Sequence, residues 1–285
     1  MFPELGRIGP IVLRSYTLLL DAAILISLAI LAYRGRKIEE KPAVWIDSGL
    51  IALLTGLILG RIGHVAIHWP YFANHTSEII QIWRGGIDWH GAILGGLLVL
   101  WIISVSRRLI FKQIADELAL ILPIAALMVY GGCLTTRCGH GREVDSLNAY
   151  PPLIVRELPD LYGVIAPRLA SQFYGIALSI SLLILSLWLA KASRRRGGRF
   201  WVILLLLATG TFLIGYTRGD AAPMIGRLRL DQVFDLVVAG VSVMGIAITG
   251  RLRRPKMRIT QIAGPPRIRR RKRFSEDRTE YDLSD

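Results

Sequence analysis

The sequence has 285 residues, 53% of them hydrophobic, and 35 lysine and arginine residues against 21 acidic ones give a formal net charge of +14. A soluble domain rarely combines so much apolar content with several uninterrupted apolar runs, so the composition argues against a soluble globular protein. The basic residues fall between the apolar runs, which is typical of membrane topology rather than of a nucleic-acid-binding surface.

The apolar residues are concentrated in seven stretches, each near the roughly 20 residues with which a helix crosses a hydrocarbon core of about 30 Å. Only a helix satisfies all of its backbone polar groups within one such span. We therefore predict an all-α, polytopic membrane protein with seven transmembrane helices. They are expected at about residues 12–33, 44–69, 90–106, 114–132, 169–190, 200–216 and 231–250.

The segments between these stretches differ in character. Residues 1–11 are rich in glycine and proline and predict a turn-prone lead into the first helix. We read this helix as retained because its apolar run lacks a convincing small-residue cleavage site. Residues 70–89 are polar and aromatic, and they predict an arm at the membrane interface. A long polar loop is expected from the end of the fourth helix to about residue 168.

Dense clusters of lysine and arginine follow the first, third, fifth and seventh stretches. Because such clusters mark the cytoplasmic side, the N-terminus is predicted to lie outside and the C-terminus in the cytoplasm. The loops after the second, fourth and sixth helices then face outward. This arrangement would bring His90, Arg142 and Arg218 to the same side of the membrane.

The last part of the sequence is strongly basic and then acidic, with no apolar periodicity. We therefore divide the chain into an integral membrane domain, residues 1–250, and a cytoplasmic tail, residues 251–285, which we predict to be disordered. The basic run at 267–273 either rests on anionic lipid or serves only as a topology anchor, and nucleic-acid binding is the least favoured role.

One polar segment, Arg84-Gly85-Gly86-Ile87-Asp88-Trp89-His90-Gly91, leads directly into the third predicted helix. It places an imidazole and a carboxylate at the mouth of that helix, beside a glycine pair. A titratable group at the edge of a bilayer is costly to keep, so His90 is a candidate functional residue. The alternative is an interfacial histidine that simply packs beside Trp89.

Further short motifs follow one another along the chain. They are Gly9-Pro10 with Arg14-Ser15-Tyr16, Gly60-Arg61-Ile62-Gly63, Gly85-Gly86 with His90-Gly91, Asp116 with Pro123, Gly132-Cys133-Leu134 with Cys138 and Gly141-Arg142, Gln172-Phe173-Tyr174, Arg218-Gly219-Asp220 and Asp231-Gln232. In this order they resemble the motifs of the bacterial prolipoprotein diacylglyceryl transferase family, including its Gly-Gly-x-x-x-His-Gly segment. The resemblance covers about residues 6–250 and fits the seven predicted spans.

The resemblance implies an enzyme of the bacterial cytoplasmic membrane that transfers a diacylglyceryl group from phosphatidylglycerol to the lipobox cysteine of a preprolipoprotein. Glycerol phosphate leaves and a thioether forms. The thiol needs a base, for which His90 is the candidate, and the anionic leaving group needs cationic donors, for which Arg142 and Arg218 are the candidates. The expected partners are phosphatidylglycerol, the precursor and membrane lipid, with neither a cofactor nor nucleic acid.

A second set of residues is expected to bind the substrate through hydrogen bonds or close backbone approach. Structural alternatives stay open: an aromatic belt residue for Tyr16, a pairing of Arg61 with Asp47 or Asp88, and a plain helix-start role for Gln172 and Tyr174. The set consists of Tyr16, Arg61, Gly85, Gly86, Gly91, Gln172 and Tyr174.

Only two cysteines occur, Cys133 and Cys138, so the sequence encodes no disulfide framework. With His140 nearby they lack the second pair of ligands that a zinc site needs, and we predict no metal. A disulfide across the four intervening residues is one possibility on the outward side. Two buried free thiols are the arrangement that we favour.

The sequence departs from the family at three positions that carry charge there. Tyr130 stands where the family has an arginine, and Thr211 and Gly215 stand where it has an arginine and a glutamate. Each of the two arginine donors would be worth about 2.7–4 kcal/mol in a catalytic step, so their replacement bears directly on turnover. They motivate an alternative function, a non-catalytic protein that binds lipid or lipoprotein precursor on the same fold.

Overall fold

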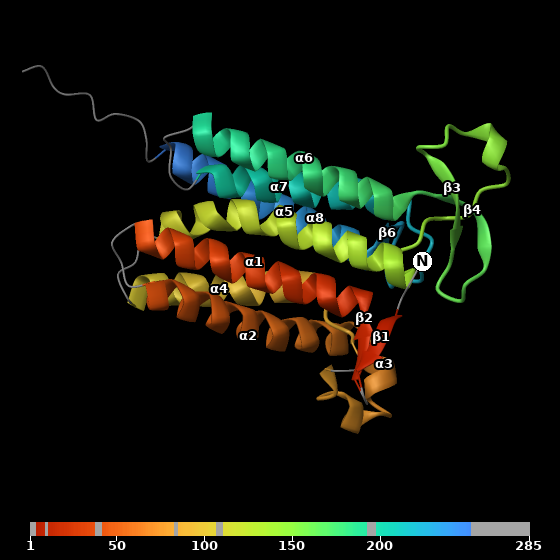
Figure 1. Cartoon of the computed structure of the whole chain (residues 1–285), viewed down its shortest axis with the longest axis horizontal. Helices are drawn as coiled ribbons and strands as arrows, with labels where there is room; N and C mark the ends of the chain where they lie inside the picture. The colour runs from red at the N-terminus through yellow and green to blue at the C-terminus, as the bar shows by residue number, and fades with distance from the viewer. Residues whose placement is uncertain are drawn as a thin grey trace, which may run out of the picture. The chain divides into compact units, whose positions relative to one another are not determined.

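A computed structural model of the chain describes residues 4–8, 11–37, 42–82, 85–106, 111–192 and 198–251 (Figure 1). Gly9, Pro10 and Arg84 of the sequence motifs lie outside these residues. So does the predicted tail, apart from its first residue.

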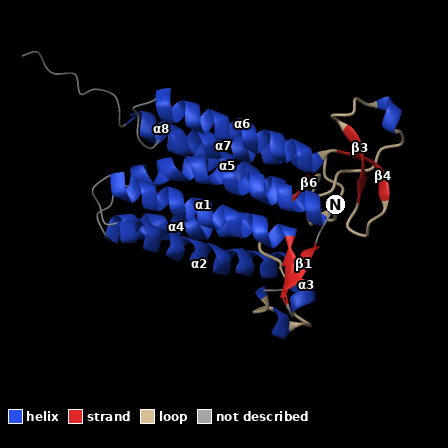
Figure 2. Cartoon of the chain, viewed as in Figure 1, coloured by secondary structure: helices blue, strands red, loops and turns tan. Residues whose placement is uncertain are grey.

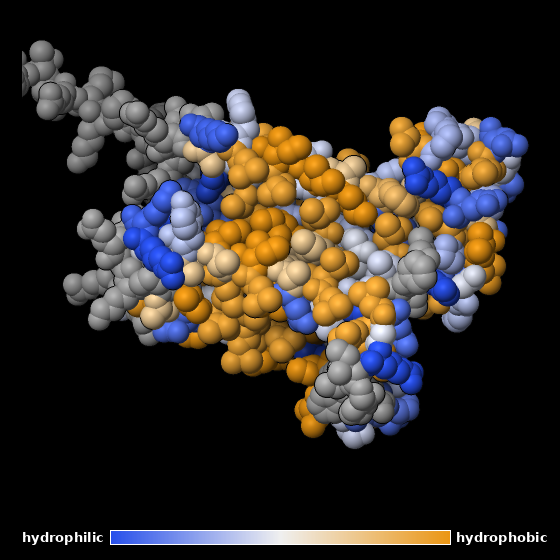
Figure 3. Space-filling view, in the orientation of Figure 1, coloured by the Kyte–Doolittle hydropathy of each residue, from blue (hydrophilic) through white to orange (hydrophobic). Residues whose placement is uncertain are grey.

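The described part of the chain is mostly helical and contains seven helices that are long and apolar enough to cross a membrane, as the hydropathy pattern predicts (Figure 2). Figure 3 shows an apolar surface over these helices, with hydrophilic residues gathered toward their ends. Leu25, Trp101 and Ile184 are among the large apolar side chains of these helices that remain exposed, as lipid-facing helices require. The seven helices are α1 (Ser15–Lys37), α2 (Pro42–Ile67), α4 (Trp89–Ser106), α5 (Phe111–Thr136), α6 (Ser171–Ala192), α7 (Gly198–Gly215) and α8 (Leu230–Arg251).

Three two-stranded antiparallel hairpins lie outside the spans, where the sequence predicted mainly turns and a loop. The predicted start of the first helix, at about Val12, was wrong: Val12 lies in a strand, and α1 begins at Ser15. The polar loop after α5 folds as a hairpin because Asp160 organises its turn: Oδ1 accepts the backbone N–H groups of Tyr162 and Val164, each at 2.9 Å. Val155 and Leu158, on the same hairpin, are buried. The strands are β1 (Glu4–Ile8) with β2 (Ile11–Arg14), β3 (Val155–Pro159) with β4 (Ile165–Leu169), and β5 (Met224–Ile225) with β6 (Leu228–Arg229).

The predicted interfacial arm begins where α2 ends at Ile67, two residues before the predicted end. It contains the short helix α3 (Trp69–Phe72) and the 3-10 turn η1 (Thr76–Glu78). Figure 1 shows this arm, β1, and the β3–β4 hairpin at one end of the helices. The starts of α1, α4, α6 and α8 meet the ends of α2, α5 and α7 there.

Helices α2 and α4 pack backbone against backbone, because glycines face each other at their crossing. A Cβ atom added at Gly91 would lie 2.7 Å from the carbonyl oxygen of Leu59, and one added at Gly56 would lie 2.9 Å from that of Ala92. Small residues permit this approach in membrane helices. The predicted close backbone approach of Gly91 is therefore made to α2.

The core contains two clusters of buried apolar residues that share α5. Ala119 of α5 packs with Leu182 of α6 and Ile203 of α7, while Ile114 of α5 packs with Leu31 of α1 and Trp45 of α2. Helix α5 therefore joins the two halves of the bundle. It also positions Tyr130 and the two cysteines at the end that carries the hairpins.

Candidate active site at the hairpin end of the helices

Asp88 is the N-cap of α4. Its Oδ1 atom accepts the backbone N–H of Gly91 at 2.8 Å, and its own N–H donates to the carbonyl of Gly60 at 2.9 Å. Burial alone would raise the pKa of Asp88, but the neighbouring imidazole of His90 and the hydrogen bond from the Gly91 N–H lower it below its ordinary value. The cap therefore fixes a carboxylate, charged at neutral pH, at the mouth of the third span.

His90 lies between two carboxylates. Its Nε2 atom is 3.4 Å from Oδ1 of Asp235 on α8, and its Nδ1 atom is 3.6 Å from Oδ2 of Asp88. The residue is only 1% exposed, and its ring also packs against Trp89 and Phe234. His90 thus packs beside Trp89, as the structural alternative expected, and also has the two carboxylate partners expected of a functional histidine.

Asp235 is a site residue that the sequence reasoning missed. It is 3% exposed within an apolar helix, and Thr211 of α7 donates a hydrogen bond to its Oδ1 atom at 2.8 Å. A carboxyl group inside a membrane span was the signal that could have found it. Thr211 occupies a position where the family has an arginine, and here its hydroxyl donates a hydrogen bond to Asp235.

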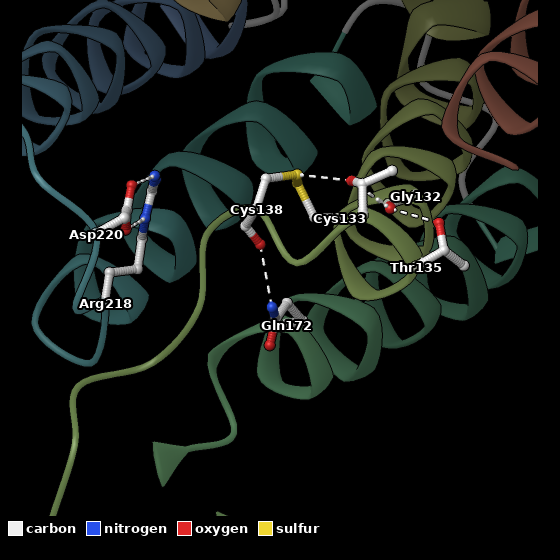
Figure 4. The surroundings of a disulfide bond; sticks show 8 residues. Gly132, Cys133, Thr135, Cys138, Gln172, Arg218 and Asp220 are labelled. Carbon is white, nitrogen blue, oxygen red and sulfur yellow. Dashed lines mark hydrogen bonds and ion pairs between the residues drawn. A yellow bond between two sulfur atoms is a disulfide. The ribbon is translucent and has the colours of Figure 1, made fainter. Parts of the chain in front are cut away.

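Arg218 belongs to a group of two arginines and two aspartates. Its guanidinium donates to Oδ1 and Oδ2 of Asp220 at 2.9 and 2.5 Å (Figure 4). It also donates to Oδ2 of Asp231 at 3.1 Å. Arg229 lies 3.3 Å from Asp220 and 3.2 Å from Asp231. The predicted phosphate-binding charge of Arg218 is therefore balanced within the protein.

The two groups are joined through α8 and α5. Asp231 and Asp235 are one turn apart on α8, so the carboxylate that binds Arg218 lies beside the carboxylate that faces His90. Tyr130 of α5 interacts electrostatically with Arg218, Asp231 and Asp235. The position where the sequence lacks a family arginine is therefore in the middle of the polar cluster.

Arg142 and Arg218 lie on adjacent backbone segments. The N–H of Arg142 donates to Thr217 at 2.8 Å, and the N–H of Gly219 donates to His140 at 2.9 Å. A Cβ atom at Gly219 would lie 2.8 Å from the Cα atom of Arg142. The structure thus brings the two predicted arginines together, with the side chain of Arg142 exposed to solvent.

Cys133 and Cys138 form a disulfide, so the prediction of two free thiols was wrong (Figure 4). Helix α5 ends at Thr136, and positive φ angles of 69° at Arg137 and 58° at Gly139 turn the chain back. This turn brings the two cysteine Cα atoms within 4.6 Å. The sequence spacing alone did not reveal where the helix ended.

Gln172 and Tyr174, at the start of α6, hold the loop that follows α5. Gln172 is 2% exposed and donates to the carbonyl of Cys138 at 3.0 Å, and the hydroxyl of Tyr174 donates to the carbonyl of Ile154 at 2.6 Å. Tyr16 packs its ring on Gly132, where a Cβ atom would lie 2.5 Å from the ring. These three residues hold the end of α5 and the loop after it in place, and their contact with substrate stays a prediction.

Arg61 is buried and uses its guanidinium to bind the interfacial arm. It donates to the carbonyls of Glu78 at 2.6 Å, Ile79 at 2.8 Å, Gly85 at 2.7 Å and Gly86 at 3.0 Å. These partners are backbone atoms, in place of the aspartates that the sequence suggested.

Gly85 and Gly86 allow these bonds because both have positive φ, 90° and 80°. A Cβ atom at Gly86 would lie 2.5 Å from Nε2 of His64. The two glycines are thus required by the turn of the arm itself. Among the described residues, no group of three or more His, Cys, Asp or Glu side chains could hold a metal ion.

Seven apolar helices with a cluster of charged side chains at one end define a multi-pass membrane protein with a polar site at the edge of its spans. Residues 3–248 match the family model described as prolipoprotein diacylglyceryl transferase. The chain belongs to this family, which confirms the resemblance seen in the sequence motifs.

Relatives from several bacteria align over most of the chain. Proteins named phosphatidylglycerol–prolipoprotein diacylglyceryl transferase are 31% identical in Nostoc (251 residues; 86% of this chain, 88% of the relative) and 31% identical in Symbiobacterium thermophilum (266 residues; 89% and 94%). The protein of that name from Bacillus velezensis is 25% identical over 247 residues, 85% of this chain and 90% of the relative.

Proposed function

We propose that this chain transfers the diacylglyceryl group of phosphatidylglycerol to a cysteine thiol of a prolipoprotein. The observation that carries this proposal is the family match over residues 3–248, nearly all of the described chain. The relatives named above all carry the name of this transferase, and this favours the enzyme over a non-catalytic lipid-binding protein on the same fold.

The reaction requires a base for the thiol and cations for the leaving phosphate. His90, held between Asp88 and Asp235, is suited to the first task because an imidazole between carboxylates can both accept and retain a proton. Arg142 is suited to the second, since its side chain is exposed next to the Arg218 segment. Arg218 itself binds phosphate in this proposal by exchanging one aspartate contact for the headgroup.

The substrate-binding roles of Tyr16, Arg61, Gln172 and Tyr174 follow from their place at this end of the helices. Gln172 is nearest to the role of a headgroup ligand, because its amide is not fully used: Oε1 of Gln172 is buried without a hydrogen-bond partner among the described residues. Arg61 acts indirectly, by holding Gly85 and Gly86 of the segment that leads to His90.

The site faces the outer side of the bacterial cytoplasmic membrane in this proposal, with the N-terminus outside and the C-terminus in the cytoplasm. Arg34, Arg36 and Lys37 end α1 on the opposite side, as the positive-inside rule requires. The Cys133–Cys138 disulfide supports the same orientation, because such bonds persist in oxidising compartments. Residues 251–285 form a cytoplasmic tail in this arrangement.

The test is a transfer assay with the full chain in phosphatidylglycerol liposomes and a lipobox peptide. We expect the peptide to gain the mass of one diacylglyceryl group in thioether linkage and glycerol phosphate to be released in equal amount. Liposomes of phosphatidylethanolamine are the matched control. Folded protein that binds the lipid but yields no product would contradict the enzyme and favour the binding protein.

A further inference from the structure

The imidazole of His90 has no direct route to a substrate. The residue is 1% exposed, its Nε2 atom faces Asp235, and its Nδ1 atom is buried with no hydrogen bond to a described residue. Nδ1 faces Oδ2 of Asp88 at 3.6 Å. A thiol that gives its proton to His90 must therefore approach through the Asp88 side.

Asp88 is the more accessible member of this pair, because 17% of its side chain is exposed. Its two oxygens have separate partners: Oδ1 accepts the Gly91 N–H of the helix cap, and Oδ2 faces His90. The cap fixes the carboxylate, so Oδ2 stays directed at the imidazole on a side chain that remains partly exposed.

Asp235 lies at the other ring nitrogen of His90, Nε2. Its Oδ1 atom receives the hydroxyl of Thr211 and faces Nε2 of His90, and the residue is 3% exposed. A carboxylate at this depth is costly unless it is paired, and the pair fixes which nitrogen of His90 carries a proton. With Nε2–H directed at Asp235, Nδ1 is the nitrogen left to accept one.

We propose that Asp88, His90 and Asp235 form one proton-accepting unit, in which Asp88 meets the substrate thiol and Asp235 is a positioning residue for His90. This inference rests on the proposed transferase function. The thiol proton passes to Oδ2 of Asp88 and on to Nδ1 of His90. The thiolate sulfur bonds to the terminal glyceryl carbon, the carbon–oxygen bond to phosphate breaks, and the electron pair leaves with glycerol phosphate. The unit returns its proton to that phosphate or to water.

The unit also gives a reason for the acids at these two positions. Removing a proton from a thiol leaves an imidazolium in a site largely shielded from water, where an unpaired charge is costly. Asp88 and Asp235, one at each ring nitrogen, provide the two acceptors that the imidazolium requires.

The experiment compares Asp88→Asn, Asp235→Asn, His90→Gln and the double variant His90→Gln with Asp235→Asn, in the full chain in phosphatidylglycerol liposomes. Asp47→Asn is the matched control, since Asp47 is exposed near the other end of α2. We expect Asp88→Asn and His90→Gln each to lower kcat by about 10²–10⁴-fold with little change in KM. The double variant should be no slower than His90→Gln, because Asp235 acts through the imidazole.

A spectroscopic measurement separates this inference from the proposed function. The ¹⁵N resonances of the His90 ring should show a proton fixed on Nε2 in the native protein and a tautomer mixture in Asp235→Asn, whether or not any turnover is seen. Asp235→Glu should restore the native pattern in part. Unchanged ring resonances in Asp235→Asn, fold-losses that multiply in the double variant, or native kcat in Asp88→Asn would each overturn the proposal. Absence of transfer by the native protein would contradict the proposed transferase function only. The ring resonances would still show whether Asp235 positions His90.

Discussion

Asp231 and Asp235 lie one turn apart on α8, and each holds a different cationic or basic group. Asp231 binds Arg218 at 3.1 Å, and Asp235 faces His90 at 3.4 Å. One helix therefore sets the spacing between the proposed proton acceptor and the arginine group. The start of α8 is fixed in turn by Gln232, whose side chain accepts the N–H of Arg229 at 3.0 Å and donates to the carbonyl of Phe212 at 3.0 Å.

Arg142 and Arg218 should respond differently to removal, although both are proposed to bind phosphate. Arg142→Ala removes an exposed side chain, so we expect KM for phosphatidylglycerol to rise about tenfold with an unchanged melting temperature. Arg218→Ala leaves Asp220 and Asp231 with one cation fewer, so the melting temperature should fall as well. Kinetics and thermal unfolding on the same detergent-solubilised samples check both. Equal loss of stability in the two variants would contradict this division.

The carboxyl group of Asp220 should make stability depend on pH on the acid side. Burial alone would raise its pKa, but Arg218 and Arg229 lower the pKa below its ordinary value. A folded-state pKa below the unfolded value of about 3.9 adds stability above that pH, and this stability is lost as the pH falls through the folded pKa.

Thermal unfolding of the native protein and Asp220→Asn between pH 7 and pH 3 tests this. The variant should be less stable at pH 7, and the difference should shrink as the pH is lowered below about 4. Glu157→Gln, an exposed strand residue, is the control. A constant difference at every pH would show that Asp220 contributes by shape rather than by charge.

Much of this architecture could be predicted from the sequence, because a membrane span is a local property of about 20 residues. The order of the motifs was sufficient to identify the family, and His90 was found because a histidine at a helix mouth is unusual. The hairpins were missed since each short strand gains its order from its partner, and β3 with β4 also from Asp160, which no single-stretch pattern reveals.

Long-range pairing was the part that could not be predicted. His90 and Asp235 are 145 positions apart, and only the tertiary structure brings the start of α4 to Asp235 of α8. For Arg61, one alternative was a pairing with Asp47 or Asp88, but in the structure four backbone carbonyls of the arm accept its hydrogen bonds. In both cases the sequence supplied the costly polar group, and the partner was decided by tertiary structure.

The Cys133–Cys138 disulfide should stabilise the end of α5 and the loop that Gln172 holds. Closing so short a loop is worth about 2 kcal/mol in the chain-entropy view. Reduction, or the paired substitution of Cys133→Ser with Cys138→Ser, should therefore lower the melting temperature by a few degrees.

Maleimide labelling of the unfolded protein provides the direct check. Without reductant neither cysteine should label, and with reductant both should, as read by intact mass. Gln172→Ala keeps the bond and removes the contact to the Cys138 carbonyl, so it separates the two contributions. Labelling without reductant would contradict the bond.

Arg61 should be the residue on which the interfacial arm depends. Four backbone carbonyls accept its hydrogen bonds, and Arg61→Ala leaves them unpaired at a cost of about 1–3 kcal/mol for each one that water does not reach. Arg61→Lys retains the charge but cannot reproduce the fork of planar donors, so it should destabilise the arm nearly as much.

Limited proteolysis should then cut either variant within residues 69–88 much faster than the native protein. Ile80→Ser, on the same arm and 75% exposed, is the control that should leave the cleavage rate unchanged. A native cleavage pattern in Arg61→Lys would mean that charge alone holds the arm, and the hydrogen-bond geometry described above would then not be what anchors it.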